Sequence, residues 1–515
     1  MCGFLVQIGG QSEKHRFPYA FNSLSHRGPD FSSDPEFTNA ISVGHHRLAI
    51  CDLSDHANQP FGVEDSHWKI VFNGQIYNHK ELKYQFNLKP RTESDTEILL
   101  LLFLLLGKNF VKQVNGDFAF VIYNQTTGDF FAARDRLGVK PLFYRRVQKN
   151  WYFASEAHAI ARLIDDYTID ILGQKQFLSL RGYFGGRSQF EAVKSFPPAH
   201  LISESVIEKY WDVSNLQTSF REKDVKELLI DAIECRIPDD VQGTSTLSGG
   251  VDSFIVSKYS KTNTTWCVGM KVQNEFKEAA HASRVLKTSH RNLQVSSEEF
   301  IDAHNSFLEK CLTPVGVGNQ VLSQLLFSEI SRTNKVTLSG EGADELFMGY
   351  DRIYRWALLN PRFDIHKFFD LYKYNPYGDI EVLEESGIND FTGTSLDIVE
   401  RFFITIHLPI LLSRLDHASM FSGVETRVPF TDYRLVELVF GSGAIGRISE
   451  LDSKIILRRI YSDLFGTKSK TNHKVGFPVP FHEISRYIQK PLNAPGDWLQ
   501  YSNDQFVEQV RKKGF

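Results

Sequence analysis

The pattern of the chain changes near Trp211, and this change constrains the fold more than any other feature of the sequence. Before it, short β-rich runs lie between turn residues, at positions 4–8, 41–48, 68–72, 118–123, 130–133 and 151–154. One strong helical segment interrupts them, starting at Ser94-Asp95-Thr96-Glu97, which fits a capping box. Layered strands with few helices predict an α+β sandwich up to about residue 185.

After Trp211, strand-like runs alternate with helical ones. The strand-like runs are 243–247, 264–270 and 335–338, and the helical runs are 254–259, 277–286 and 321–331. Such alternation predicts a parallel α/β sheet, and from about residue 354 the pattern is mostly helical. A turn-rich stretch with Gly182, Gly185, Gly186, Pro197 and Pro198 separates the two patterns. We therefore predict domains at 2–185 and 212–515, joined by a linker at 186–211.

Composition excludes several classes of protein. In 515 residues, 42% are hydrophobic and 23% charged, which is ordinary for a globular chain. A net charge of -4 provides no basic field for nucleic acid or an anionic membrane. The longest apolar run, 98–106, has nine residues, whereas a membrane span needs about 20, so we expect a buried helix there. Five cysteines without close pairing, and no secretory signal, predict a cytoplasmic protein.

Cys2 is a candidate nucleophile. Removal of Met1 would leave Cys2 with a free α-amino group that titrates near ~7.7–8.0, so one residue would carry both a thiol and its base. The alternative is an unimportant cysteine at a chain end. Asn73 and Gly74 offer an amide and an unhindered N–H for an oxyanion hole. Arg47 would bind a carboxylate and Asp95 an ammonium; taken singly, each of these residues also suits a turn, a surface ion pair or a helix start.

The order of these motifs resembles the class II glutamine amidotransferase domain over residues 2–185. The segments that carry the resemblance are Met1-Cys2-Gly3, 26–30, 46–48, 73–78, 94–97, 116–120 and 133–138. It implies an N-terminal-nucleophile αββα sandwich that releases ammonia from L-glutamine. Cys2 would be the nucleophile, Asn73 and Gly74 the oxyanion hole, and Arg47 and Asp95 the glutamine-binding residues. The family usually has glutamate where this chain has Gln75, so we expect weaker binding of the glutamine ammonium.

A second motif, Leu247-Ser248-Gly249-Gly250-Val251-Asp252-Ser253, lies between a predicted strand and a predicted helix. Its two glycines allow a tight turn whose amides, with the helix N-terminus, bind phosphate. Asp252 would hold Mg²⁺. The string resembles the PP-loop of ATP pyrophosphatases. A second acidic turn, Ser339-Gly340-Glu341-Gly342-Ala343-Asp344-Glu345, follows another strand, and Asp344 would supply a further Mg²⁺ ligand.

The second half, 212–515, is similar to the synthetase domain of glutamine-hydrolysing asparagine synthetases. The resemblance implies an ATP site lined by Leu247, Ser248, Gly249, Gly250, Asp252, Ser253, Val268, Ser339 and Gly340. It makes Glu341 the acid/base on an acyl-adenylate and Lys454 the residue that steadies pyrophosphate. Lys454 belongs to a basic cluster with Arg458, Arg459, Lys468, Lys470 and Lys474. Arg414-Leu415-Asp416 and the segment 424–430 indicate helix packing and a buried ion pair.

One departure concerns the acceptor. Where asparagine synthetases carry Thr and Arg for the α-carboxylate of aspartate, this chain has 315–320, Val-Gly-Val-Gly-Asn-Gln, without a cation. Arg352 and Arg355 are candidates to replace it.

These observations predict a two-site ligase that amidates a carboxylate, aspartate first among the candidates, with ATP and Mg²⁺. Ammonia would cross an internal passage from Cys2 to the acyl-adenylate, shielded from protonation. The alternatives are an amidotransferase for another carboxylate, such as a sugar acid or a secondary metabolite, and an inactive binding or regulatory homologue. The sequence leaves the oligomeric state open, a homodimer among the alternatives.

Overall fold

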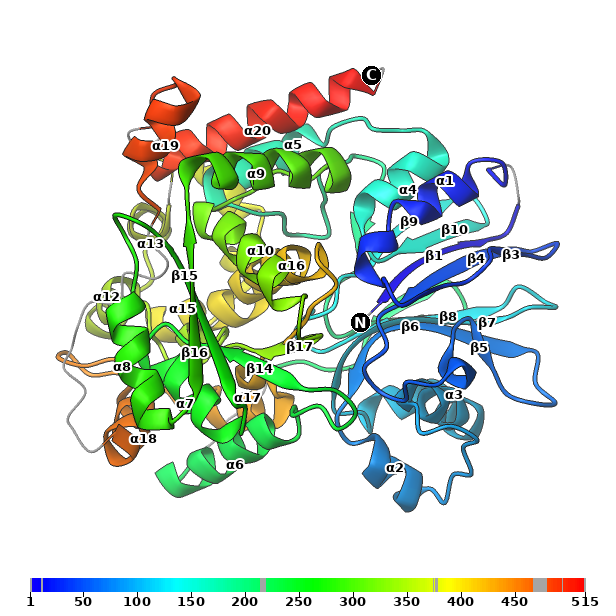
Figure 1. Ribbon diagram of the computed structural model, residues 1–515, viewed down its shortest axis with the longest axis horizontal. Helices are drawn as coiled ribbons and strands as arrows, with labels where there is room; N and C mark the ends of the chain where they lie inside the picture. Colours follow the sequence, from blue (N-terminus) through cyan, green and yellow to red (C-terminus); the bar gives the residue numbers. More distant parts are fainter. Residues whose placement is uncertain are drawn as a thin grey trace.

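The computed structural model describes residues 2–10, 13–213, 219–373, 375, 378–465, 479–492 and 494–513. It divides into two halves that pack side by side (Figure 1). Among the described residues, no helix combines the length and the apolar character needed to cross a membrane.

The first half is a four-layer sandwich of two mainly antiparallel sheets between helices (Figure 1). One sheet has the order β11 (Lys194–Ser195), β9 (Phe143–Val147), β10 (Asn150–Ala154), β1 (Cys2–Ile8), β4 (Ile41–Arg47), β2 (Phe31–Ser32), with β3 (Glu36–Phe37) also on β4. The other has the order β13 (Val206–Lys209), β12 (His200–Ser203), β8 (Phe130–Arg134), β7 (Gly116–Asn124), β6 (Trp68–Ile76), β5 (Phe61–Gly62). Phe4, Val6, Val71, Val121 and Phe153 pack between the sheets. The predicted αββα sandwich is confirmed.

Helices cover the outer faces of both sheets. Helices α1 (Phe17–Asn22) and α4 (Ala157–Ile164) pack on the first sheet, and α3 (Asp95–Leu106) packs on the second beside α2 (His79–Gln85). Helix α3 is the one expected from the leucine-rich run, but Leu104 and Leu105 are exposed. Of the predicted capping box, only the N-cap residue Ser94 is confirmed. Ser94 accepts from the N–H of Thr96, whereas the Glu97 carboxylate accepts from the N–H groups of residues 91 and 92 instead.

The second half contains a five-stranded parallel sheet, as predicted. Its order is β16 (Ser289–Val295), β15 (Thr264–Met270), β14 (Gly243–Thr246), β17 (Val336–Leu338), β18 (Glu425–Arg427). One connected group of helices consists of α6 (Glu222–Glu234), α7 (Val251–Tyr259), α8 (Phe276–Leu286), α17 (Tyr433–Val439) and α18 (Ile455–Phe465). A second group consists of α9 (Ser297–Cys311), α10 (Gly318–Ile330) and α16 (Leu408–Met420).

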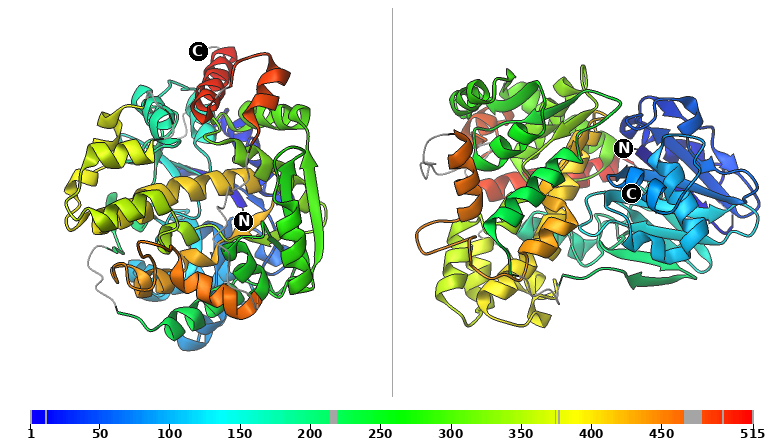
Figure 2. Two further views of the ribbon diagram at one scale, coloured as in Figure 1. Left: turned by 90° about the vertical axis from the view of Figure 1, so that its left-hand side faces the viewer. Right: turned by 90° about the horizontal axis from the view of Figure 1, so that it is seen from below.

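The remaining chain is helical, as expected from residue 354. It contains α12 (Asp351–Leu359), α13 (Ile365–Tyr372), α14 (Ile380–Glu384), α15 (Ser395–Phe402), α19 (Phe481–Ile488) and α20 (Pro495–Lys512), while α5 (Ile171–Leu180) comes from the first part of the chain. A π-helical turn, Phe403–His407, joins α15 to α16 without a break. The result is a long helical rod that crosses the second half, yellow to gold in the left view of Figure 2.

The segment 186–211, expected to be a linker, contains strands of both sheets. β11 pairs with β9, and β12 pairs with β8 and β13. The β-rich runs on either side of Ser203 outweigh the turn residues Pro197 and Pro198, which occupy only a bend between strands. We propose that the first domain extends to the end of β13.

The two halves share buried surface. Leu48, Ile50, Leu137 and Val139 of the first half belong to one hydrophobic cluster with α6, α17 and α18 of the second. Figure 1 places the start of β1 at this junction. Cys2 therefore lies at the boundary between the halves and not on an outer face.

Candidate active sites

Cys2 is the first residue of β1 and is fixed on both sides. Its main-chain N donates to Asn73 Oδ1 at 2.9 Å, and its carbonyl accepts from Arg27 Nε at 3.2 Å. In the β1–β4 register Cys2 lies opposite Arg47. Burial raises the pKa of the Cys2 thiol, which makes a neighbouring base necessary for its ionisation.

Asn73 and Gly74 lie beside Cys2 at the end of β6. Among the described residues, none accepts a hydrogen bond from the buried Asn73 Nδ2. Phe118, opposite Gly74, uses its N–H and C=O on Asp135, so the antiparallel ladder turns the Gly74 N–H away from β7. A Cβ on Gly74 would lie 2.2 Å from the Asp117 carbonyl oxygen, so only glycine fits. Two donors are thus left near the thiol, as an oxyanion hole requires.

Asp95 and Gln75 form a buried pair at the N-terminus of α3. Gln75 Nε2 donates to Asp95 Oδ2 at 2.9 Å, and the Ile76 N–H donates to the same oxygen. The oxygen of Gln75 accepts from Arg427 Nη2 at 2.9 Å. Because Arg427 only donates and a carboxylate only accepts, the amide can have just this orientation. Gln75 therefore spans from Asp95 to the second half, and its oxygen already accepts one hydrogen bond.

Arg47 is committed to the loop that follows β4. Its Nη1 donates to the Ser54 carbonyl and to Asn58 Oδ1, each at 2.8 Å. Its Nη2 donates to the carbonyls of Cys51 and Asp52. The Arg47 guanidinium thus stabilises the conformation of this loop. Binding of a glutamine carboxylate by Arg47 stays a prediction.

Buried charges join the two halves close to Cys2. Arg27 donates to Glu156 Oε1 at 2.9 Å and to Asp416 Oδ2 of α16 at 2.8 Å, and all three side chains are buried. Burial lowers the pKa of Arg27, but these two carboxylates raise it above its usual value. A second link runs from Gln75 to Arg427, which pairs with Glu425. The buried ion pairs that the sequence indicated in 414–430 are present, and they hold the halves together.

The predicted phosphate loop connects β14 to α7. Ser253 Oγ accepts from the Ser248 N–H and donates to the Gly250 carbonyl, which closes the loop. Gly249 has φ +84°, and Gly250 is the N-cap of α7. The backbone conformation of Gly249 is one that favours glycine. The loop ends at a helix N-terminus at the carboxyl edge of a parallel sheet, where phosphates bind.

The two aspartates predicted to bind Mg²⁺ lie together. Lys454 Nζ contacts Asp252 Oδ2 at 2.8 Å and Asp344 Oδ1 at 2.6 Å. A Cβ on Gly349 would lie 1.9 Å from Asp344 Oδ1, so the glycine leaves the space that the carboxylate occupies. Two carboxylates converging beside a phosphate loop fit Mg²⁺, which prefers one or two carboxylates together with phosphate oxygens.

The acidic turn that follows β17 packs against the phosphate loop. A Cβ on Gly340 would lie 2.9 Å from the Ser253 main-chain N. The Ser339 N–H donates to the Arg427 carbonyl at 3.0 Å, so β18 anchors the turn. Burial, with Asp344 and Glu341 nearby, raises the pKa of Glu345 to about 8. The loops after β14 and β17 therefore meet, and they bring Ser339, Gly340 and Glu341 to Asp252.

The remaining predicted residues belong to the ATP site, the basic cluster and the proposed acceptor cations. Leu247 and Val268 are fully buried below the loop. Arg459 pairs with Glu222, and Arg458 donates to the Ser453 carbonyl. Lys468, Lys470 and Lys474 lie outside the described residues. Arg352 and Arg355 donate to the carbonyls of Leu371 and Leu451, and neither lines the cavity at the junction of the two halves.

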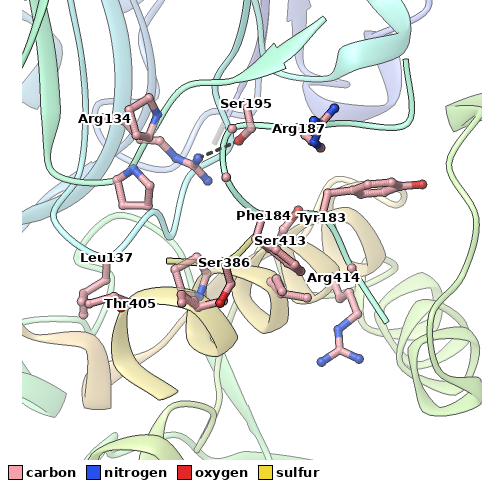
Figure 3. A pocket seen from close by; sticks show the side chains of 18 of the residues that line it. Arg134, Leu137, Tyr183, Phe184, Arg187, Ser195, Ser386, Thr405, Ser413 and Arg414 are labelled. Atoms are coloured by element: carbon pink, nitrogen blue, oxygen red, sulfur yellow. Dashed lines mark hydrogen bonds between the residues drawn. The ribbon is translucent and has the colours of Figure 1, made fainter. Parts of the chain in front are cut away.

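Some residues that the sequence did not mark lie at the junction of the two halves. Arg181 and Arg414 line a cavity of about 410 Å³, in which Figure 3 labels Arg414, and the Tyr372 hydroxyl contacts both His407 and Arg181. The sequence marked the motif around Arg414 only for helix packing and a buried ion pair. No local pattern marks Arg181 or His407, because their surroundings are assembled from distant parts of the chain.

Comparison with known proteins identifies both halves. Residues 1–211 match the model of a glutamine amidotransferase domain, and residues 224–494 match that of asparagine synthase. The chain is similar to glutamine-hydrolyzing asparagine synthetase 1 of Bacillus subtilis (strain 168), with 27% identity over 97% of this chain and 89% of the relative. It is also similar to asparagine synthetase 3 of that organism, with 28% identity over 94% and 88%. The chain belongs to the asparagine synthase family, with a glutamine amidotransferase domain preceding the synthase domain.

Proposed function

We propose that this protein transfers the amide nitrogen of glutamine to a carboxylate that ATP has activated as an acyl-adenylate. The products would be the amide, glutamate, AMP and pyrophosphate. One observation carries the proposal. A buried ion pair joins the half that contains Cys2 and the unused donor Asn73 Nδ2 to the half that contains the phosphate loop and the paired aspartates Asp252 and Asp344. The curated relatives are named asparagine synthetases, which makes aspartate the first candidate acceptor.

At the first site the Cys2 thiol would attack the glutamine side-chain amide. The Cys2 main-chain N, an amine once Met1 is removed, lies in position to take the thiol proton. Asn73 Nδ2 and the Gly74 N–H would stabilise the oxyanion. Asp95 would bind the glutamine ammonium and Arg47 the carboxylate. Ammonia leaves, and water hydrolyses the thioester to glutamate.

At the second site the phosphate loop would hold ATP while the acceptor carboxylate attacks its α-phosphorus. Asp252 and Asp344 would hold Mg²⁺, which supplies charge neutralisation of the phosphates. Lys454, between these carboxylates, would steady the departing pyrophosphate. Glu341 would take a proton as ammonia attacks the adenylate.

Ammonia would travel between the sites through the interior, beside α16. Asp416 of this helix binds Arg27, which contacts Cys2, and Arg414, two residues earlier, interacts electrostatically with Glu341 of the acidic turn. An enclosed route keeps ammonia unprotonated and water away from the adenylate. A reducing compartment such as the cytoplasm stays the predicted location, and all five cysteines are free.

A different carboxylate is the second candidate acceptor. The segment 315–320 carries no cation for the α-carboxylate of aspartate, and Arg352 and Arg355 do not replace it. The third alternative, an inactive homologue, conflicts with the intact set of Cys2, Asp252 and Glu341.

The test measures glutamate formation from glutamine and acid-stimulated pyrophosphate release from MgATP. The wild type should show both, and Cys2→Ala should lose the first while keeping the second with added ammonia. Absence of any acid-stimulated pyrophosphate release would contradict the ligase. Glutaminase activity that survives Cys2→Ala would contradict the role of Cys2.

A further inference from the structure

A cavity of about 410 Å³ lies at the junction of the two halves. Figure 3 shows the helical rod of α16 along its floor, with Arg134 and Ser195 of the first half above it. Apolar side chains line much of it, including Phe177, Tyr183, Phe184 and Ile410. The volume lies in the range of small-molecule sites, roughly 300–1,000 Å³.

The lining is strongly basic, and most of its cations have evident partners. Arg134 and Arg136 donate to main-chain carbonyls, Arg187 binds Asp170, and Lys209 binds Asp212. Arg414 differs. Among the residues that the structure describes, no carboxylate forms an ion pair with it, and in Figure 3 its side chain points away from Arg134 and Arg187.

Arg181, which also lines the cavity, lies near Arg414. Burial lowers the pKa of Arg414 and the Arg181 guanidinium lowers it further, whereas Glu341 raises it. Two guanidiniums are thus close enough to repel each other, beside the carboxylate proposed as acid/base. An anion between them would relieve the repulsion.

A chain of hydrogen bonds fixes this pair next to the acidic turn. Tyr350 donates to Glu345, and its hydroxyl lies 3.2 Å from His407 Nε2. His407 Nδ1 lies 2.7 Å from the Tyr372 hydroxyl, which is also hydrogen-bonded to Arg181. Burial and the two arginines hold the pKa of His407 far below its usual value, so it stays neutral and adds no charge. The hydrogen bonds therefore connect Arg181, which lines the cavity, to Glu345 of the acidic turn.

We infer that this cavity is the acceptor site and that the acceptor is a carboxylic acid with a second anionic group. Its body is larger than that of a free amino acid, and Arg414 and Arg181 bind the second anionic group. This inference rests on the proposed function and names its substrate class. The carboxylate to be amidated lies toward Glu341, the second anionic group lies between the arginines, and the body fills the apolar part beside Tyr183 and Ile410. The pair takes the place of the cation that 315–320 lacks.

The test compares acceptors of matched chemistry by pyrophosphate release with ammonia as nitrogen donor. The probes are L-aspartate, galacturonate and galacturonate 1-phosphate; the last two share a ring and a carboxylate but differ in the second anionic group. Galacturonate 1-phosphate should give the highest kcat/KM. The inference would be overturned if aspartate gave a higher kcat/KM than either ring acid, although the proposed function would then still stand. It would also be overturned if neither ring acid raised pyrophosphate release above the rate measured without any acid.

Variants then test the arginine directly, using the acid with the highest kcat/KM. Arg414→Gln should raise its KM about 10- to 100-fold, as expected for a lost charge-assisted contact. Arg414→Lys should restore part of the affinity. Lys209→Gln, which changes a lining cation that is paired with Asp212 and exposed, is the matched control and should alter KM less than about 2-fold. An acceptor KM in Arg414→Gln within 2-fold of the wild type would overturn the assignment. An unfolding temperature equal to that of the wild type shows that the variant is folded.

Discussion

Replacing Gln75 by glutamate tests the neutral side chain that lies between Asp95 and Arg427. The amide donates to Asp95 and accepts from Arg427, each at 2.9 Å. A glutamate keeps the contact with Arg427 but turns a carboxylate oxygen toward Asp95, which is only 4% exposed. Two carboxylates would then face each other in a buried site. We expect Gln75→Glu to be less stable than the wild type when glutamine is absent.

Proton uptake limits the size of this loss. Two unit charges about 3 Å apart, at an effective dielectric constant of about 20, repel by roughly 5–6 kcal/mol. Protonating the new carboxylate costs about 1.4 kcal/mol for each pH unit above its usual pKa of about 4.3. At pH 7 this cost is close to 4 kcal/mol. The protein adopts the lower of the two energies, which is the cost of protonation, and the neutral carboxyl gains no charge attraction to Arg427. The expected loss is about 4 kcal/mol of unfolding free energy, and it shrinks as the pH falls toward 5, because protonation becomes easier.

Glutamine should reverse the effect, because its ammonium supplies the charge that the two carboxylates lack. The assay is thermal unfolding at pH 7 and pH 5, with and without glutamine, in a Cys2→Ala background that prevents turnover. Gln75→Glu should gain more from glutamine than the wild type does. Gln75→Leu, which removes both hydrogen bonds without adding charge, should lose stability but show no such gain. Equal unfolding temperatures of wild type and Gln75→Glu without glutamine, or equal gains with it, would refute the reasoning.

Variants at three further positions probe the sites and the junction. Asn73→Ala should lower the glutaminase kcat about 10²–10³-fold and leave ammonia-dependent synthesis intact, since it removes one oxyanion donor; a change below tenfold would contradict that role. Asp416→Ala should cost about 3–5 kcal/mol in urea unfolding, because Arg27 loses a buried counter-ion, and Asp416→Asn should cost less. Burial raises the pKa of Glu425, but Arg427 outweighs it and the pKa lies at about 2, below the usual 4.5. This pair therefore stabilises the fold above about pH 4.5, and up to about 3 kcal/mol of unfolding free energy is lost as the pH falls toward 2. Glu425→Gln should be less stable than the wild type at pH 7 and should lose less stability as the pH falls. An equal loss of stability in acid would contradict the pairing.

The strands of the fold could be predicted where local pattern decides them. The β-rich runs of the first half all correspond to strands, because alternating or continuous apolar residues bury at least one face. The edge strand β16, Ser289–Val295, was missed because it is polar and mostly exposed, so it carries no burial pattern. β18, Glu425–Arg427, was missed because its three residues are polar and become buried only through partners elsewhere.

The candidate sites divide in the same way. Cys2, Asn73, Asp252 and Asp344 stood out because their chemistry is written in short contiguous motifs, and the structure brings each into a group. Arg414 did not stand out, because its significance depends on Arg181 and Glu341, which come from distant parts of the chain. Likewise Arg27 meets Asp416 across 389 positions, a separation that no local pattern encodes.

The enclosed guanidinium of Arg27 has a consequence for how such a chain can change over time. Its two counter-ions come from opposite halves, so a glutaminase portion produced alone would carry a cation stripped of one neutralising neighbour. Exchanging that portion for the equivalent piece of a relative would succeed only if the incoming piece presents a cation to Asp416. The two catalytic modules thus form one heritable unit, and chimaeras are viable only between chains whose junctions match.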